Sequence, residues 1–268
     1  MSRAVRGRGL RRLREQAGRG ADRVAAVDFS TGGNHRVIPN DVASAKSTLI
    51  VPPDTFARQL GALKNDGWTT ITLGQLADDL EAGIRPKPKT FVITIDDGWA
   101  DGYRYALPIL EGYGDVATYF VIAGRIDHPD FLDVQQIRAL VAAGMEIGDH
   151  TVDHVALNGG GTPQRKYEIA AAAATIAEVT GKWPETLAYP SGRFNAIAEQ
   201  AVAACQGMKM AVIEGNGTYE TWATRFEIPR LKVHPGTDPR TLISWMTYPW
   251  RPAPSQVPGA SEPPDTDD

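Results

Sequence analysis

The feature that most constrains the fold is a repeated alternation of short β-rich runs and longer amphipathic segments between about residues 26 and 250. The longer segments carry apolar residues at helical spacing, and Gly closes most of them. This alternation is typical of repeated βα units, which build a parallel sheet covered by helices. We therefore expect an α/β fold, and in particular a distorted (β/α) barrel with about seven strands.

Seven strands and seven helices are predicted from this pattern. The clearest strand is TFVITI, residues 90–95, because a compact β-rich run passes directly into acidic residues. The expected strands are 68–73, 90–95, 117–123, 145–148, 186–189, 210–213 and 227–233. The expected helices are 55–65, 75–82, 105–111, 133–143, 164–180, 196–205 and 239–246.

The two ends of the chain differ in composition from the middle. Residues 1–25 carry eight Arg against two acidic residues, and residues 251–268 are rich in Pro and acid. We expect a basic, disordered arm over 1–25, one folded domain over 26–250 and a disordered tail over 251–268. Because the arm has no interleaved aromatic residues, we interpret it as a solvated arm and expect no nucleic-acid partner.

Export and membrane signals are weak. The Arg pair at residues 11–12 is not followed by an apolar run, so we expect no cleaved signal peptide, and the sequence favours a cytoplasmic location. No run of about 18 apolar residues predicts a transmembrane helix. The single cysteine, Cys205, excludes an internal disulfide and a multi-cysteine zinc site, so a metal would need His and carboxylate ligands.

Two acidic residues, Asp96 and Asp97, stand where the strand 90–95 ends and just before Gly98. Consecutive strand residues point to opposite sides, so one carboxylate can bind a cation while its neighbour stays beside the water that the cation activates. A plain turn is the alternative, because Asp-Asp-Gly is common turn chemistry. Functional residues of parallel α/β barrels lie at such strand ends, which favours a site here.

Two of the five histidines, His150 and His154, follow the predicted strand 145–148 in the segment GDHTVDH. Imidazoles four residues apart share one face if the loop is helical there, and neutral imidazole is a good ligand for zinc. A coincidence of two surface histidines is the alternative. The pair occurs in the same sequence as Asp-Asp-Gly, so we favour a metal site.

A third segment, AYPSGRFN, leaves a predicted strand through a Pro-Ser-Gly turn. This turn could aim the Ser191 backbone N–H at a developing oxyanion, and a plain connection is the alternative. Arg230 follows a Pro at the start of another strand. It could orient the base carboxylate through a bidentate pair, with a surface ion pair as the alternative.

Taken in order, TIDDG, HTVDH and YPSGRFN resemble the first three motifs of the polysaccharide deacetylase (NodB homology) family. The resemblance spans roughly residues 35–235, through the stretches VPPDTFARQLGALKNDGWTTITLGQLADDLEAG, YALPILEGYGDVATYFVIAG and AGMEIGDHTVDH. It implies a NodB-type barrel with Asp96 as catalytic base. It also implies a divalent metal on Asp97, His150 and His154, with zinc as the first choice and cobalt, nickel or manganese as alternatives.

The same resemblance implies a metal-dependent hydrolase that removes acetyl groups from N-acetylated amino-sugar carbohydrate. Hydrolysis of a small or cyclic amide or of an O-acetyl ester is the alternative activity, and a non-catalytic carbohydrate-binding pseudoenzyme is the alternative of another class. Family members often act on envelope or extracellular glycans, which differs from the location that the N-terminus favours.

Three departures from the family pattern affect the predicted substrate contacts. Ile95 replaces the usual Phe, the Arg often found before the third-motif Pro is absent, and Ser191 replaces a common aromatic residue. Tyr189, Pro190, Ser191 and Arg230 are the residues expected near the substrate or the oxyanion.

The family also uses a histidine as general acid, and two candidates exist. His35 in NHRV resembles a Tyr-His-x-Val segment of members related to poly-N-acetylglucosamine deacetylases, which are the closest in layout. His234 in LKVH resembles the Leu-x-His of the fifth motif, with a plain turn histidine as the alternative. We prefer His35, and we interpret His128 as a solvated loop residue.

Overall fold

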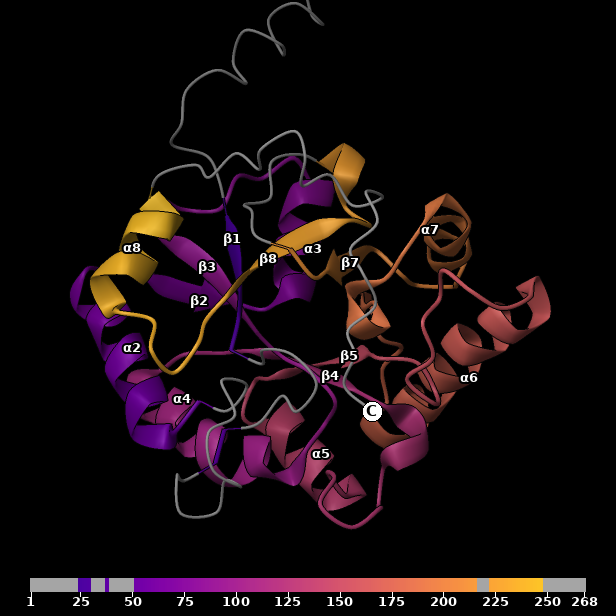
Figure 1. Cartoon of the computed structure of the whole chain (residues 1–268), viewed down its shortest axis with the longest axis horizontal. Helices are drawn as coiled ribbons and strands as arrows, with labels where there is room; N and C mark the ends of the chain where they lie inside the picture. Colours follow the sequence, from indigo (N-terminus) through magenta and orange to yellow (C-terminus); the bar gives the residue numbers. More distant parts are fainter. Residues whose placement is uncertain (1–23, 30–36, 39–50, 216–221, 248–268) are drawn as a thin grey trace, which may run out of the picture.

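The computed structural model describes residues 24–29, 37–38, 51–215 and 222–247, and these form an α/β fold (Figure 1). The strands are β1 (Ala25–Asp28), β2 (Thr69–Ile71), β3 (Thr90–Ile95), β4 (Thr118–Val121), β5 (Glu146–Asp149), β6 (Thr186–Ala188), β7 (Met210–Ile213) and β8 (Ile228–Lys232). The helices are α2 (Pro53–Asn65), α3 (Leu73–Glu81), α4 (Leu107–Tyr113), α5 (Val134–Ala142), α6 (Thr162–Thr180), α7 (Ala196–Ala203) and α8 (Pro239–Thr247).

The strands form a closed parallel barrel in the described part of the chain. The ring runs β1, β8, β7, β6, β5, β4, β3 and closes because β1 pairs with β3 as well as with β8. The prediction of a barrel with about seven strands is confirmed, but the strands that form it are not all the predicted ones. The four-residue β1 was not predicted. The strand expected at 68–73 is β2, which among the described strands pairs with β3 alone and so lies outside the ring.

One end of the barrel is closed by α3. Its first N–H groups bind the opening residues of two strands, with Leu73 N–H donating to Thr118 Oγ1 at 2.9 Å and Gly74 N–H donating to Glu146 Oε2 at 2.8 Å. The apolar face of α3 packs against inward-facing strand residues in one buried cluster, which includes Val24, Ala26, Leu73, Leu76, Ala77, Val92, Phe120, Ala188, Met210, Val212 and Ile228. Because α3 packs at the amino ends of the strands, the carboxyl ends are the favoured place for a site.

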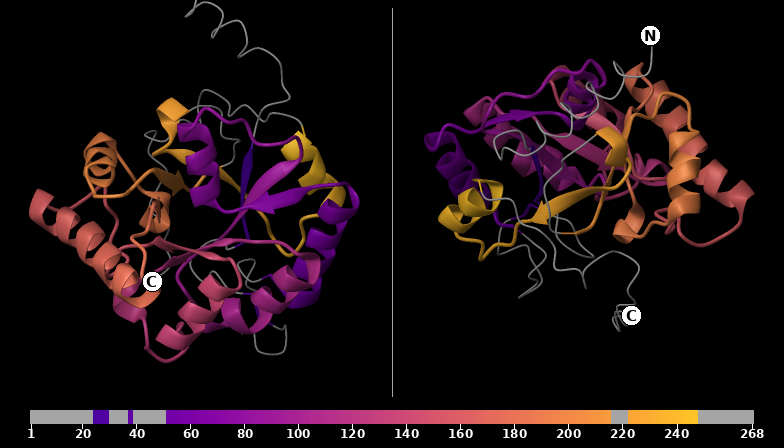
Figure 2. Two further views of the ribbon diagram at one scale, coloured as in Figure 1. Left: turned by 180° about the vertical axis from the view of Figure 1, so that it is seen from behind. Right: turned by 90° about the horizontal axis from the view of Figure 1, so that it is seen from above.

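The remaining helices cover the outside of the barrel. In Figure 1, α2, α4, α5, α6 and α7 surround the strands, and the views of Figure 2 show the same arrangement. Helix α8 contacts α2, so segments from the two ends of the described chain meet in the outer layer. Outward-facing strand residues pack beneath these helices in two further buried clusters.

The division into arm, domain and tail stays a prediction, because residues 1–23 and 248–268 lie outside the described residues. Strand β1 begins at Ala25, the last residue of the predicted arm. Within the ranges that the structure describes, no helix has the length and apolar character needed to cross a membrane.

Candidate metal centre

The turn after β3 brings Asp97 to the carboxyl end of the barrel. Asp97 and Gly98 both adopt positive φ, 70° and 76°. A Cβ at Gly98 would lie 3.1 Å from Val121 Cγ1, so both the backbone angle and the space favour glycine. The indole N–H of Trp99 donates to Asp97 Oδ2 at 3.2 Å. The two alternatives considered for Asp-Asp-Gly, a turn and a metal-binding carboxylate, therefore do not exclude each other: Asp97 lies in a turn and its carboxylate faces the candidate metal site.

Asp97 meets two histidines from the loop after β5. Its Oδ1 lies 3.4 Å from His150 Nε2 and 3.6 Å from His154 Nε2, and one ligand atom from each of the three residues lies within 4.8 Å of the others. The imidazoles converge, but not through a helix. Residues 150–154 form a loop in which Thr151 and His154 have positive φ, 65° and 60°. The sequence predicted a shared face only if this segment were helical; instead, two left-handed residues shape a loop in which both imidazoles face Asp97.

The orientation of His150 suits a metal ligand. Its Nδ1 lies 2.8 Å from the carbonyl oxygen of Ala188, which can only accept, so Nδ1 carries the proton and Nε2 faces Asp97 with its lone pair. Burial lowers the pKa of His150, but the carboxylates of Asp97 and Asp96 raise that pKa by more, so it lies above the usual value. This negative potential would also favour a cation. The side chain of His154 is 34% exposed, which leaves the site open on one side.

The neighbouring acid, Asp96, is held by a buried guanidinium. Arg230 Nη1 donates to Asp96 Oδ1 at 2.7 Å and Nη2 donates to Asp96 Oδ2 at 2.8 Å, while Asp28 Oδ2 lies 3.5 Å from Nη2. Burial lowers the pKa of Arg230, but Asp28 and Asp96 raise that pKa by more, so the side chain stays charged. All three side chains are at most 3% exposed, which excludes the surface ion pair.

Comparisons with known proteins show to which family the chain belongs. The sequence profile of the family described as polysaccharide deacetylase matches residues 83–211. YxkH of Bacillus subtilis strain 168, whose name describes a candidate polysaccharide deacetylase, is 30% identical over 195 residues, which are 72% of this chain and 69% of YxkH. The chain belongs to the polysaccharide deacetylase family.

Two solved structures are similar to this chain over most of its length. The deacetylase PplD of Streptococcus pyogenes, solved in complex with acetate, is 26% identical with a TM-score of 0.76, over 84% of this chain and 98% of PplD. IcaB from Ammonifex degensii is 23% identical with a TM-score of 0.71, over 85% of this chain and 98% of IcaB, and shows a similar fold. The NodB-type barrel expected for a polysaccharide deacetylase is therefore confirmed.

The third family motif forms a tight turn after β6. Ser191 is exposed and left-handed, with φ 54° and ψ 23°, and the buried Pro190 precedes it. A Cβ at Gly192 would lie 2.2 Å from the Cβ of Glu214, so the turn requires glycine. The side chain of Tyr189 does not join the metal group. It packs in the outer core beside Phe194, 5.4 Å between ring centroids, because it points to the face of β6 opposite to Ala188.

Of the two histidines predicted as general acid, the structure describes His234 but not His35. His35 lies outside the described residues. His234 lies in an exposed turn just beyond β8, where its N–H donates to Thr237 Oγ1 and its carbonyl accepts from Gln59. His128 is exposed, as predicted for a solvated loop residue.

Three residues near the candidate metal centre were not predicted: Asp28, Trp99 and Glu168, whose Oε2 accepts from the N–H groups of Val152 and Asp153. Asp28 follows the apolar run AAV much as Asp96 follows TFVITI, so the same pattern of acid after strand could have indicated it. Trp99 comes directly after Asp-Asp-Gly, but nothing in the sequence says that its indole turns back to Asp97.

Proposed function

We propose that this chain is a metal-dependent deacetylase that removes acetyl groups from N-acetylated amino-sugar carbohydrate. The observation that carries the proposal is a pair of adjacent acids with different partners. Asp96 is buried and clamped by Arg230, while Asp97 faces two imidazole nitrogens. Membership of the polysaccharide deacetylase family supports the hydrolysis of acetylated carbohydrate.

The residues present fit a divalent metal. One carboxylate oxygen and two imidazole nitrogens from Asp97, His150 and His154 form a donor set that zinc accepts, and three protein ligands are typical of a catalytic rather than a structural zinc site. When bound, such a metal would polarise the acetyl carbonyl and make water easier to deprotonate. Zinc is the first choice, and cobalt, nickel and manganese are alternatives.

The proposed task of Asp96 is to accept the proton of the attacking water. Because both carboxylate oxygens bind Arg230, the plane of the carboxylate is fixed and Arg230 serves as a positioning residue. The backbone N–H of Ser191, in its exposed left-handed turn, is the proposed donor to the oxyanion.

Cleavage of the C–N bond then needs a proton on the departing nitrogen, which leaves acetate and a free amine. We keep His35 as the first candidate for this acid and His234 as the second, since histidine titrates near neutrality. Single His35→Ala and His234→Ala variants separate them, because only loss of the acid should suppress acetate release while metal stays bound.

The test combines metal analysis of the purified chain with acetate release from chitooligosaccharides, poly-N-acetylglucosamine fragments and acetylated xylan. Asp96→Asn should keep the metal and lose turnover, whereas His150→Ala should lose the metal. Release from xylan alone would instead indicate an O-acetyl esterase. Glycan binding without acetate release would indicate a pseudoenzyme, and retained turnover in Asp96→Asn would remove the base from the proposal.

A further inference from the structure

The loop that carries both histidine ligands, residues 150–161, is held by a buried acid of α6. Glu168 is 3% exposed, and its Oε2 accepts hydrogen bonds from the N–H groups of Val152 and Asp153, at 3.1 and 3.0 Å. These two residues lie between the two ligand histidines in the sequence. One carboxylate oxygen therefore fixes the middle of the His-x-x-x-His segment.

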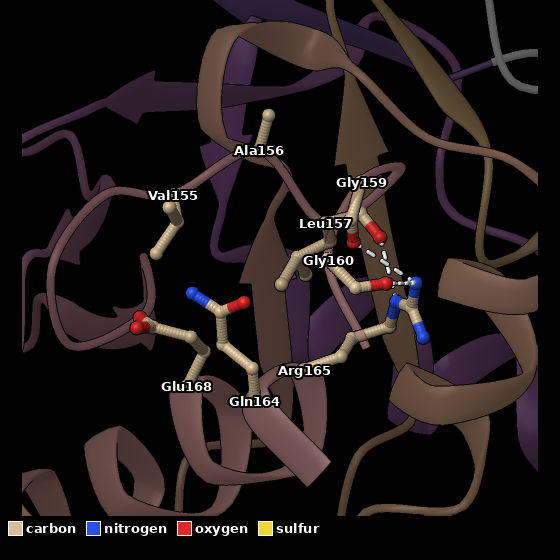
Figure 3. Close-up of a pocket in the computed structure, with 8 residues that line it drawn as sticks. All are labelled: Val155, Ala156, Leu157, Gly159, Gly160, Gln164, Arg165 and Glu168. Carbon is tan, nitrogen blue, oxygen red and sulfur yellow. Dashed lines mark hydrogen bonds between the residues drawn. The ribbon is translucent and has the colours of Figure 1, made fainter. Parts of the chain in front are cut away.

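A second buried charge on the same face of α6 holds the far half of the loop. Arg165 Nε donates to the Leu157 carbonyl at 2.7 Å, and Arg165 Nη2 donates to the carbonyls of Gly159 and Gly160 at 3.0 and 3.1 Å. Figure 3 shows Arg165 reaching these carbonyls, with Glu168 further along the same helix. The backbone that Arg165 holds carries none of the proposed metal ligands.

The segment between the histidines needs such support. Thr151 and His154 are left-handed without being glycine, a strained backbone conformation that persists only where the surroundings impose it. From the other side, the N–H of Gly124 donates to the Val152 carbonyl at 2.9 Å, and a Cβ at Gly124 would lie 2.6 Å from that oxygen. The Val152 backbone is thus bound on its N–H side by Glu168 and on its carbonyl side by Gly124.

We propose that Glu168 is a positioning residue of the metal site: it holds the Val152–Asp153 backbone, between the left-handed Thr151 and His154, so that His150 and His154 both face Asp97. The inference rests on the proposed metal-dependent function. Removing partners that orient metal ligands weakens metal binding by about 10- to 100-fold, because the freed ligands must be ordered again when the metal binds. Arg165 should stabilise the folded loop but have little effect on the metal affinity.

The test measures zinc affinity of the full chain by competition with a chromophoric chelator, together with the melting temperature of the metal-free chain. Glu168→Gln keeps an acceptor oxygen at the same reach but removes the charge, whereas Glu168→Asp keeps the charge and withdraws it by one methylene. We expect Glu168→Gln to bind zinc almost as wild type does, and Glu168→Asp and Glu168→Ala to bind about 10- to 100-fold more weakly. Arg165→Met is the matched control, which should lower the melting temperature and leave zinc affinity close to wild type.

Wild-type affinity in Glu168→Asp and Glu168→Ala would overturn the positioning role. A loss in Glu168→Gln at least as large as that in Glu168→Asp would also overturn it, because an acceptor oxygen at the right reach would then not preserve the affinity. The same holds if Arg165→Met weakens zinc binding as much as Glu168→Ala does. A wild-type chain that binds no zinc, cobalt, nickel or manganese would refute the proposed metal site itself, which is a different outcome. The Glu168→Gln and Glu168→Asp variants test the positioning role even if Glu168→Ala does not fold.

Discussion

Replacing Arg230 by methionine should destabilise the fold more than any surface charge deletion. Arg230 makes two short bonds to Asp96 and lies 3.5 Å from Asp28, and all three side chains are at most 3% exposed. The variant keeps most of the apolar stem and removes the cation that two buried carboxylates share. Each carboxylate would then lie in the barrel without its guanidinium partner.

The magnitude follows from the burial of the pair. Removing one partner of a buried ion pair costs about 3–5 kcal/mol of unfolding free energy, because the remaining charge is desolvated without compensation. For a domain of this size each kcal/mol shifts the melting temperature by roughly 2–4 °C. We therefore expect Arg230→Met to melt about 6–20 °C lower than wild type.

The assay is urea and thermal unfolding of the chelator-treated chain, followed by circular dichroism. Lys209→Met is the control, because Lys209 lies 2.5–3.2 Å from Asp78, Glu81 and Glu185 but Asp78 and Glu81 are more than half exposed. Exposed pairs contribute about 1 kcal/mol or less. If Arg230→Met costs no more unfolding free energy than Lys209→Met, the reasoning from burial is refuted.

Three further variants test individual contacts. Trp99→Phe removes the indole N–H from the metal carboxylate and should weaken zinc binding by about 10-fold with little change in metal-free melting; unchanged zinc affinity would contradict this. Burial raises the pKa of Asp149 to about 7, so between about pH 4 and 7 the folded chain binds more protons than the unfolded chain and loses stability as pH rises. In metal-free protein the stability of Asp149→Asn relative to wild type should therefore rise by about 1.4 kcal/mol per pH unit over that window, and a constant difference would refute the assignment. Gly148→Ala would place a methyl carbon 2.5 Å from the Phe120 ring and should cost about 1–3 kcal/mol in urea unfolding, whereas Gly112→Ala, with open space around it, should not destabilise the chain.

Much of the fold could be predicted because the signals are local. Strands β3 and β7 are predicted to the residue, since each is a compact β-rich run with clear breaks around it. The helices α2, α5 and α6 are predicted with their ends shifted by one or two residues, because apolar spacing and closing glycines mark them. Strand β1 was missed because four residues, AAVD, next to an Arg-rich segment carry no periodic pattern.

The candidate site, like the fold, could be predicted only in part. Asp96, Asp97, His150 and His154 were predicted as site residues because each group is contiguous and follows a predicted strand, and parallel strands place their carboxyl ends at one face. The structure brings Asp97, His150 and His154 together. The route by which the histidines converge was not predictable, since the left-handed Thr151 also accepts a hydrogen bond from the N–H of Ala123, which is distant in the sequence.

What the sequence determined by itself is the order of βα units, the strand ends and the residue types that stand there, because hydrophobic periodicity and turn chemistry act over a few neighbouring residues. Only the tertiary structure decided which distant groups meet. Closure of the barrel through β1 brings Asp28 to Arg230, and Arg230 reaches Asp96 across 134 residues of chain. Glu168 likewise reaches the ligand loop from the next helix. Such pairs carry no sequence signal, because their geometry exists only once the strands have closed and the helices have packed around them.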